Sequence, residues 1–239
     1  MAFLLCIETA TPMCTVALAH DGYVLAHAAE EGDPANAERR YIHAERTNVL
    51  IQAIMDRTGL AFKDLDGVAV GVGPGSYTGL RIGLSAAKGL CYALGIPIIG
   101  IGTLDTLVAA LRQRIPDPVV TEDVLWPMID ARRMEVFTSV RNASGYGEGP
   151  THPQVLDEAW CAALPAGKRH VVFGDGADKA AMLWATSEHV LHLPGVRPLA
   201  SMMAGIAMAR WSAGQLDDLA YLVPEYGKEA RPTRPRPRS

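Results

Sequence analysis

A glycine-rich segment in the first half of the chain constrains the fold more than any other. Gly67–Val72 is an apolar run typical of a buried strand, and Gly73-Pro74-Gly75-Ser76 has the composition of a tight turn. Thr78–Leu94 then has the spacing of a helix, and Gly95 is placed to end it. A strand followed directly by a turn and a helix is a building unit of α/β folds. Other segments must therefore supply strands that pair with this one.

Those strands are predicted on both sides of the segment. Short apolar runs predict strands at Phe3–Ile7, Cys14–Ala19, Tyr23–His27 and Ile96–Ile101, with a hairpin turn at Asp21-Gly22. Helical spacing predicts helices at Tyr41–Thr58, which Gly59 ends, and at Thr103–Arg112. This order predicts a mixed sheet covered by helices.

The second half repeats part of this pattern. Strands are predicted at Leu125–Ile129, Met134–Val140 and His170–Phe173, and helices at Asp157–Leu164, Ala177–Ala185 and Leu199–Ala213. Hydrophobic residues make up 49% of the 239 residues, which is enough for a folded core. We therefore expect an N-terminal half at 1–103, a C-terminal half at 104–226 whose last helix can pack back on the first half, and a disordered Arg/Pro tail at 227–239.

The charge distribution limits the classes of partner. The net charge is −4, but Lys228–Ser239 holds five basic residues and one acid, a tail of +4 that leaves 1–227 at −8. An acidic body argues against a broad nucleic-acid-binding face. The four cysteines form no C-x-x-C pair, no export signal is evident, and the uncharged stretch Gly89–Leu104 is too short and too broken to span a bilayer. We expect a cytoplasmic protein with no membrane contact.

The helix predicted at Thr78–Leu94 is unusually poor in bulky and charged side chains. Its only charges are Arg81 and Lys88, and its small residues are Gly79, Gly83, Ser85, Ala86, Ala87 and Gly89. Each interior glycine costs roughly 0.5–1 kcal/mol relative to alanine, so a close neighbour must offset the cost. That neighbour is either the second half of this chain or another subunit.

Candidate cofactor-binding residues lie at two strand ends. Glu8 and Thr9 follow the first strand, and Gly73, Gly75 and Ser76 form the glycine-rich turn. The turn fits neither the Walker spacing nor the G-x-G-x-x-G spacing, and Ser76 lacks the G-x-S-x-G context of a nucleophile. A structural turn and a phosphate cradle both stay open.

Metal and acid–base sites are not predicted. His43 has Thr47 at the position where a second helical ligand would stand, and Asp130-Ala131-Arg132-Arg133 has the composition of a surface or interdomain salt-bridge cluster. We therefore predict no catalytic residue and no metal site in this chain.

Three segments together resemble the bacterial TsaB (YeaZ) family: Leu5–Leu18, Gly71–Gly83, and Met128–Arg132 followed by a strand. The resemblance extends from Phe3 to about Tyr226. It implies an actin/Hsp70-like (ASKHA) fold of two ribonuclease-H-like halves, with mixed sheets flanked by helices. It also implies a non-catalytic scaffold or dimerisation subunit for forming N6-threonylcarbamoyladenosine at position 37 of tRNAs, next to the anticodon. Its partners would be the catalytic paralogue TsaD and the ATPase TsaE, with a homodimer in isolation and tRNA contacted indirectly.

The chain departs from the pattern of the catalytic paralogue. Pro12 and Met13 stand where that paralogue has two acids after its first strand, and His43 with Thr47 replaces its H-x-x-x-H metal motif. The resemblance therefore implies no cofactor of its own, with ATP and metal on the partner subunits. The alternative is a stand-alone ATP-hydrolysing or glycoprotease-like enzyme on the same fold.

The resemblance implies that the helices Tyr41–Thr58 and Thr78–Leu94 form the partner interface. The predicted contacts are Ile42, Arg46, Leu50, Gly79, Gly83, Leu84, Ala87 and Cys91. A separate hypothesis makes the basic tail a tRNA-binding arm.

Overall fold

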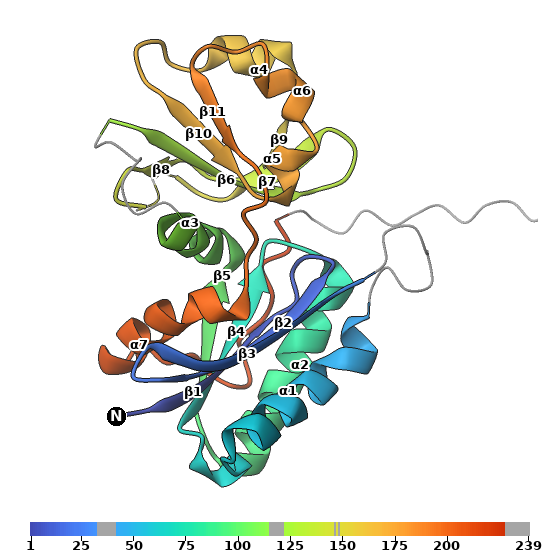
Figure 1. Cartoon of the computed structure of the whole chain (residues 1–239), viewed down its shortest axis with the longest axis vertical. Helices are drawn as coiled ribbons and strands as arrows, with labels where there is room; N and C mark the ends of the chain where they lie inside the picture. The colour runs from blue at the N-terminus through green and yellow to red at the C-terminus, as the bar shows by residue number, and fades with distance from the viewer. Residues whose placement is uncertain (33–41, 115–121, 146, 148, 228–239) are drawn as a thin grey trace, which may run out of the picture.

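Two mixed sheets form the two halves of the molecule (Figure 1). The computed structural model describes residues 1–32, 42–114, 122–145, 147 and 149–227. The first sheet has the order β3-β2-β1-β4-β5. Its strands are β1 (Phe3–Glu8), β2 (Met13–His20), β3 (Tyr23–Glu31), β4 (Gly67–Gly73) and β5 (Ile98–Gly102). Strands β1, β2 and β3 pair antiparallel, whereas β4 and β5 continue the sheet in parallel on the other side of β1.

The second sheet repeats this topology. Its order is β11-β10-β6-β7-β9, with the short β8 (Arg141–Asn142) also paired to β6. The other strands are β6 (Val124–Asp130), β7 (Glu135–Thr138), β9 (His152–Val155), β10 (His170–Phe173) and β11 (Val190–Leu193). Strand β6 takes the place of β1, because it pairs antiparallel with β7 and parallel with β10. The predicted fold of two related halves with mixed sheets is confirmed.

Helices cover both faces of the first sheet. Helices α1 (His43–Thr58) and α2 (Tyr77–Leu94) pack on one face, where Leu50, Ile54 and Leu84 join the core of β1 and β4. The 3-10 helix η1 (Phe62–Asp64) follows α1. The 3-10 helix η2 (Ala200–Met203) and α7 (Ala204–Ser212) pack on the other face. The end of the chain therefore returns to the first half.

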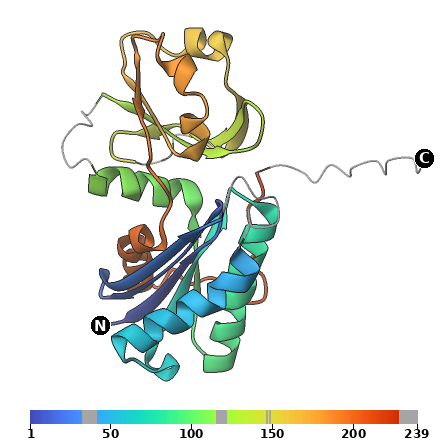
Figure 2. The same ribbon diagram turned by 45° about the vertical axis from the view of Figure 1, so that its right-hand side comes forward.

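Helix α3 (Thr103–Arg114) lies between the two halves (Figure 2). It packs Leu107 and Leu111 against the core of β6 and β10. The other face of the second sheet is covered by α4 (Glu158–Ala163), α5 (Asp175–Asp178) and α6 (Ala181–Trp184). There Trp126 donates its indole N–H to His170 Nδ1 at 3.1 Å within a cluster of aromatic rings.

After α7 the chain runs back along the first half as a strap, residues 214–227. Asp217 N–H donates to Ile98 O at 3.0 Å, and Gly100 N–H donates to the Asp217 carboxylate at 2.7 Å, so the strap covers the open edge of β5. Near its end, Glu225 N–H donates to Val72 O at 2.7 Å. The strap thus ends beside the glycine-rich turn that follows β4.

The differences from the predicted elements have local causes. Strand β9 was not predicted. It contains Pro153, which has no backbone N–H to donate and is tolerated because β9 is an edge strand. The helix predicted at Ala177–Ala185 is instead two short helices, α5 and α6. The helix predicted at Leu199–Ala213 begins as the 3-10 helix η2. Tyr41 and the tail from Lys228 onward lie outside the described residues.

Within the described ranges, no helix is both long enough and apolar enough to cross a membrane.

Candidate functional site

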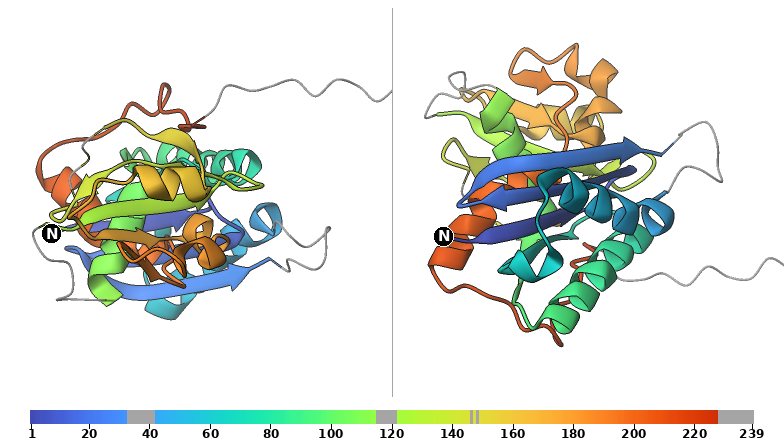
Figure 3. Two further views of the ribbon diagram at one scale, coloured as in Figure 1. Left: turned by 90° about the horizontal axis from the view of Figure 1, so that it is seen from above. Right: turned by 60° about the horizontal axis from the view of Figure 1, so that its bottom comes forward.

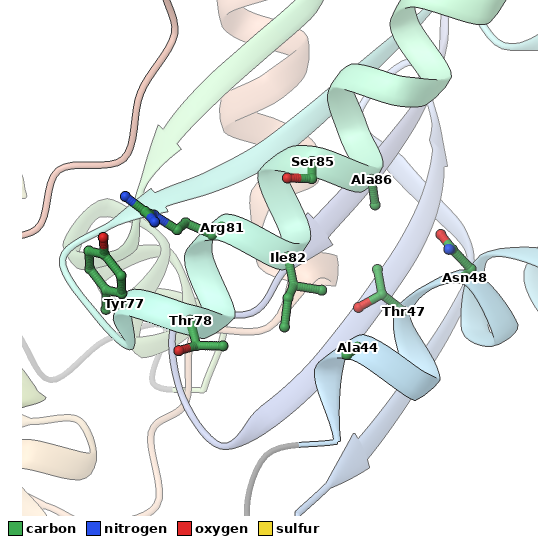
Figure 4. A pocket seen from close by; sticks show the side chains of 9 residues that line it. All are labelled: Ala44, Thr47, Asn48, Tyr77, Thr78, Arg81, Ile82, Ser85 and Ala86. Carbon is green, nitrogen blue, oxygen red and sulfur yellow. The ribbon is translucent and has the colours of Figure 1, made fainter.

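Helices α1 and α2 lie side by side on the outside of the first half (Figure 3). Between them is a shallow groove of about 620 Å³, which we call the α1–α2 groove (Figure 4). Its lining residues are Ala44, Thr47 and Asn48 from α1, and Tyr77, Thr78, Arg81, Ile82, Ser85 and Ala86 from α2. Alanine, serine and threonine predominate, so the surface is flat enough for a helix of another chain to approach closely.

One end of the groove is polar and aromatic. The Arg81 guanidinium lies 4.1 Å from the centre of the Tyr77 ring, and Arg81 Nε donates to the Tyr226 hydroxyl at 2.8 Å. The Tyr77 and Tyr226 rings pack with their centres 4.6 Å apart. These contacts tie the end of the strap to the first turns of α2.

The predicted interface residues divide into two groups. Ile42 and Arg46 lie partly exposed, and Arg46 Nε donates to the Glu30 carboxylate at 2.6 Å. The other six are buried in the chain's own core, so their side chains do not face outward, and their contact with a partner stays a prediction: Leu50, Gly79, Gly83, Leu84, Ala87 and Cys91. The exposed faces of the same two helices carry the groove.

The inward-facing glycines serve a contact within the chain. Thr9, just after β1, packs against the first turns of α2, and its hydroxyl donates to Gly79 O at 2.9 Å. A Cβ at Gly79 would overlap Thr9 O, and one at Gly83 would overlap Thr9 Oγ1. The neighbour that offsets the glycine cost is therefore the loop after β1, which is neither the second half nor another subunit.

The structure brings Glu8 and Thr9 together with the glycine-rich turn. The carboxyl group of Glu8, however, is buried and faces the backbone of the loop after β1. Its carboxylate Oε1 accepts the backbone N–H groups of Thr9 and Ala10, each at 2.8 Å. These are N–H groups of the kind that would bind a phosphate. Gly71 is required beneath Glu8, since a Cβ there would lie 2.5 Å from the carboxylate. Burial raises the pKa of Glu8 to about 7, against the opposing effect of the two backbone hydrogen bonds.

The turn residues are likewise engaged within the chain. Ser76 N–H donates to Ala10 O at 2.7 Å, and the Ser76 hydroxyl caps α2 by accepting Gly79 N–H at 3.2 Å. Gly73 has φ +108°, and a Cβ there would overlap the strap at Glu225 O. This arrangement favours the structural turn over the phosphate cradle, because the loop, the helix cap and the strap occupy the space around it.

His43 is a core residue of α1. Its Nε2 lies 2.9 Å from Thr11 O, and burial lowers its pKa. Thr47 donates its hydroxyl to His43 O at 2.7 Å, and both residues are buried. Among the residues that the structure describes, no three His, Cys, Asp or Glu side chains are grouped so as to hold a metal ion.

A second cavity, of about 510 Å³, lies between the halves and is called the interdomain cleft here. Its lining includes Ser76 from the first half, Tyr226 from the strap, and Asp130, Arg132 and Asp175 from the second half. Burial raises the pKa of Asp175 to about 6, and its carboxylate accepts the Asp130 N–H at 3.1 Å. The salt bridge expected in this region is present, but its cation is Lys179 and not the neighbouring arginines, because Asp130 pairs with the Lys179 ammonium group.

Comparison with known proteins places the chain in a family. The family described as TsaD, tRNA N6-adenosine threonylcarbamoyltransferase, matches residues 24–162. The tRNA threonylcarbamoyladenosine biosynthesis protein TsaB of Haemophilus influenzae is 31% identical over 187 residues, which cover 76% of this chain and 72% of that protein. The chain belongs to the TsaB (YeaZ) family. The resemblance noted in its sequence is thereby confirmed.

Solved structures show the same fold as this TsaB-family chain. YeaZ from Pseudomonas aeruginosa superposes with a TM-score of 0.75 at 23% identity, covering 95% of this chain and 100% of that one. The ethanolamine utilization protein EutJ from Carboxydothermus hydrogenoformans, an actin/Hsp70-like protein, gives a TM-score of 0.52 at 10% identity, covering 87% and 90%. The expected ASKHA fold is confirmed.

The groove residues were missed because α2 carries two stripes of small residues. Gly79, Gly83 and Ala87 form one, and Ser85, Ala86 and Gly89 form the other, at similar helical spacing. Sequence periodicity alone does not say which stripe faces the sheet of this TsaB-family chain. The exposed small residues of α1, Ala44 and Asn48, are a signal that an exposed stripe exists.

The contact with Thr9 predicts that alanine substitutions at two glycines of α2 have opposite effects on the free energy of unfolding. We expect Gly83→Ala to lower the free energy of unfolding by about 1–3 kcal/mol, because its Cβ meets the Thr9 hydroxyl. Gly89→Ala, which meets nothing within 4 Å, should raise it by about 0.5–1 kcal/mol. Urea denaturation measures both. Equal effects of the two substitutions would show that Thr9 does not press on Gly83.

The raised pKa of Glu8 predicts a pH dependence of stability. An unfolded glutamate ionises near pH 4.5, whereas Glu8 in the folded chain stays neutral up to about pH 7. The stability that neutral Glu8 contributes is therefore fully present below pH 4.5 and is lost as pH rises to about 7, a change of up to about 3 kcal/mol.

Glu8→Gln, which mimics the neutral form, should flatten the stability profile over this window. Asp175 also has a raised pKa, so the unmodified chain and the Glu8→Gln variant should both keep a smaller loss of stability with rising pH. Glu188→Gln, at an exposed carboxylate, is the matched control and should leave the profile unchanged. Urea denaturation between pH 4.5 and 7.5 measures the effect. A Glu8→Gln profile as steep as that of the unmodified chain would contradict the assignment.

Proposed function

We propose that this chain takes part in forming N6-threonylcarbamoyladenosine at position 37 of tRNAs as a non-catalytic scaffold subunit. In this proposal it binds a catalytic paralogue of the TsaD type, together with an ATPase of the TsaE type, and the group transfer takes place on the paralogue. Membership of the TsaB family supports the pathway. The α1–α2 groove is the single observation that supports the scaffold role.

The groove has the properties of a helix-packing surface. Its floor is formed by short side chains such as Ala44, Ser85 and Ala86, and Ile82 adds an apolar centre (Figure 4). Exposed apolar side chains continue the surface along both helices, with Val49 45% and Tyr92 84% exposed. Two helices of a related subunit would pack on this surface, with helix axes about 8–10 Å apart. Such an interface would bury about 1,600 Å² of total surface.

The same face is also the one that we propose for the expected homodimer. A surface formed by two neighbouring helices can pack on a copy of itself about a two-fold axis. A paralogue with the same fold presents an equivalent pair of helices to this chain. We therefore propose that the homodimer and the heterodimer use the same face and exclude each other.

The interior contacts of the turn support a role without its own nucleotide. The N–H groups of Thr9 and Ala10 are bound by the Glu8 carboxylate, and the strap lies against Gly73. A phosphate placed there would have to displace a buried carboxylate. ATP and metal are accordingly proposed for the partner subunits.

An arginine substituted into the groove should weaken binding of the partner without affecting the folding of this chain. Ser85→Arg places a long charged side chain where the partner helix would pack, and we expect the affinity for the TsaD-type partner to fall at least tenfold, about 1.4 kcal/mol. Threonylcarbamoyladenosine in tRNA, measured by nucleoside chromatography in a reconstituted reaction, should fall in proportion. The melting temperature should stay unchanged, because Ser85 is exposed.

Ala181→Arg is the matched control, since it adds the same side chain to an exposed helical alanine of the second half. It should leave the complex and the modification intact. Loss of modification by Ser85→Arg with an intact heterodimer on a sizing column would show that the groove is not the interface. Turnover of ATP by the isolated chain, measured with magnesium present, would favour the stand-alone enzyme.

A further inference from the structure

The strap is fixed along one flank of α2. Lys88 Nζ donates to Ala220 O at 3.2 Å, and Arg81 Nε donates to the Tyr226 hydroxyl at 2.8 Å. Because residues seven positions apart lie on one face of an α-helix, both contacts come from the same face of α2. The right-hand view of Figure 3 shows the strap passing from α7 to the end of α2. The strap therefore follows α2 back toward its first turn.

The inward side of the strap is anchored to the first half. Leu219 and Leu222 pack against the core between the first sheet and α2. The Asp217 carboxylate accepts Gly100 N–H at 2.7 Å and pairs with the Arg210 guanidinium at 3.2 Å. The strap, all of which the structure describes, contains no helix or strand. Its conformation is therefore set by these contacts with the sheet and with α2.

The outward side of the strap presents large apolar side chains to the solvent. Tyr221 is 81% and Val223 66% exposed. Tyr92 on α2 is 84% exposed, and it lies one helical turn from Lys88 on the same face. Since Lys88 bonds Ala220, the three exposed side chains are grouped around that hydrogen bond. We call Tyr92, Tyr221 and Val223 the strap patch.

The strap patch continues the α1–α2 groove. Arg81 and Tyr77 line the groove and also hold Tyr226 of the strap. Ser85, another groove residue, lies three positions before Lys88 and is therefore its neighbour on the helix surface. One surface thus extends from α1 across α2 to the strap.

The groove alone is too small for a stable complex. Nine residues line it (Figure 4), whereas a specific interface takes about 20–30 residues a side and about 800 Å² from each partner. A partner whose helices pack in the groove must therefore cover neighbouring surface as well. The strap patch adjoins the groove, and two of its three members are tyrosines, which are among the usual hot spots of interfaces.

We propose that the strap is part of the partner interface, and that Tyr221 and Val223 pack against the same TsaD-type paralogue that occupies the α1–α2 groove. The choice of partner rests on the proposed function. Because the strap is already held by α2 and the sheet in the isolated chain, its outward side chains lose little conformational freedom when the partner binds. The interface then crosses α2, with α1 on one side and the strap on the other.

Truncation of the strap side chains tests this contact. Tyr221→Ala with Val223→Ser, made in the full chain, should weaken binding of the TsaD-type paralogue from the same organism at least about tenfold. Isothermal titration calorimetry measures the affinity. The melting temperature should stay unchanged, because both side chains are exposed and the bond to the Asp218 carboxylate comes from the Tyr221 backbone N–H.

Tyr23→Ala with Val24→Ser is the matched control. It removes the same two residue types from β3, where Tyr23 is 80% and Val24 39% exposed, away from α2 and the strap. The control should leave the affinity unchanged. An affinity that the strap substitutions leave unchanged, or that the control lowers as much, would overturn the proposal.

Photo-crosslinking identifies what covers the strap. The chain is made with p-benzoylphenylalanine in place of Tyr221 and is mixed with the TsaD-type paralogue and the TsaE-type ATPase. The proposal predicts a cross-link to the paralogue, and none when the same amino acid replaces Tyr23. A cross-link from position 221 only to the ATPase, or only to a second copy of this chain, would assign the strap to another occupant and contradict the proposal.

Failure of this proposal is distinguishable from failure of the proposed function. If Ser85→Arg weakens the complex and lowers the modification while the strap substitutions do neither, the scaffold role stands and the strap contact does not. If neither variant changes the affinity for the paralogue or the modification, both proposals fail. If both variants weaken the complex and the control does not, both proposals are supported.

Discussion

The contact between Thr9 and the glycines of α2 is the constraint on which the rest of the structure depends. It lets the loop after β1 enter the space that side chains at Gly79 and Gly83 would otherwise fill. The Thr9 hydroxyl bonds Gly79 O, and Ser76 N–H bonds Ala10 O, so the loop and the turn after β4 hold each other in place. Because Gly79 and Gly83 face the loop after β1, the other stripe of small residues on α2, which includes Ser85 and Gly89, faces the solvent beside α1.

The same contact decides what chemistry the turn can perform. A glycine-rich turn between a strand and a helix is suited to bind phosphate when its N–H groups are free. Here the neighbouring N–H groups of Thr9 and Ala10 are held by the Glu8 carboxylate, which is buried, and the strap packs against Gly73. The loop after β1 and the turn after β4 are therefore used for packing within the chain. The α1–α2 groove is the surface that we propose for a partner.

Local sequence patterns predicted most helices and strands. The features that they did not predict depend on contacts between residues far apart in the sequence. Gly59 and Gly95 end their helices in the left-handed conformation, with φ of +70° and +68°, as their positions after helical runs predicted. Strand β10 has the bounds that its apolar run predicted. The inward face of α2 was not predictable, because it depends on Thr9, which is 70 residues from Gly79 in sequence. The interdomain cleft was missed for the same reason, since Ser76, Asp175 and Tyr226 line one cavity only in the folded chain.

Hydroxyl-radical footprinting of the unmodified chain tests the scaffold account most directly. The chain is first diluted until it is monomeric, and oxidation rates are compared with and without the TsaD-type partner. On α2, Tyr77 is 50% and Tyr92 84% exposed, whereas Tyr23 at 80% and Met182 at 86% lie away from the groove and serve as internal references. The account predicts that the partner slows oxidation of Tyr77 and Tyr92 and leaves Tyr23 and Met182 unchanged. Unchanged rates at Tyr77 and Tyr92, with protection at Tyr23 or Met182, would contradict it.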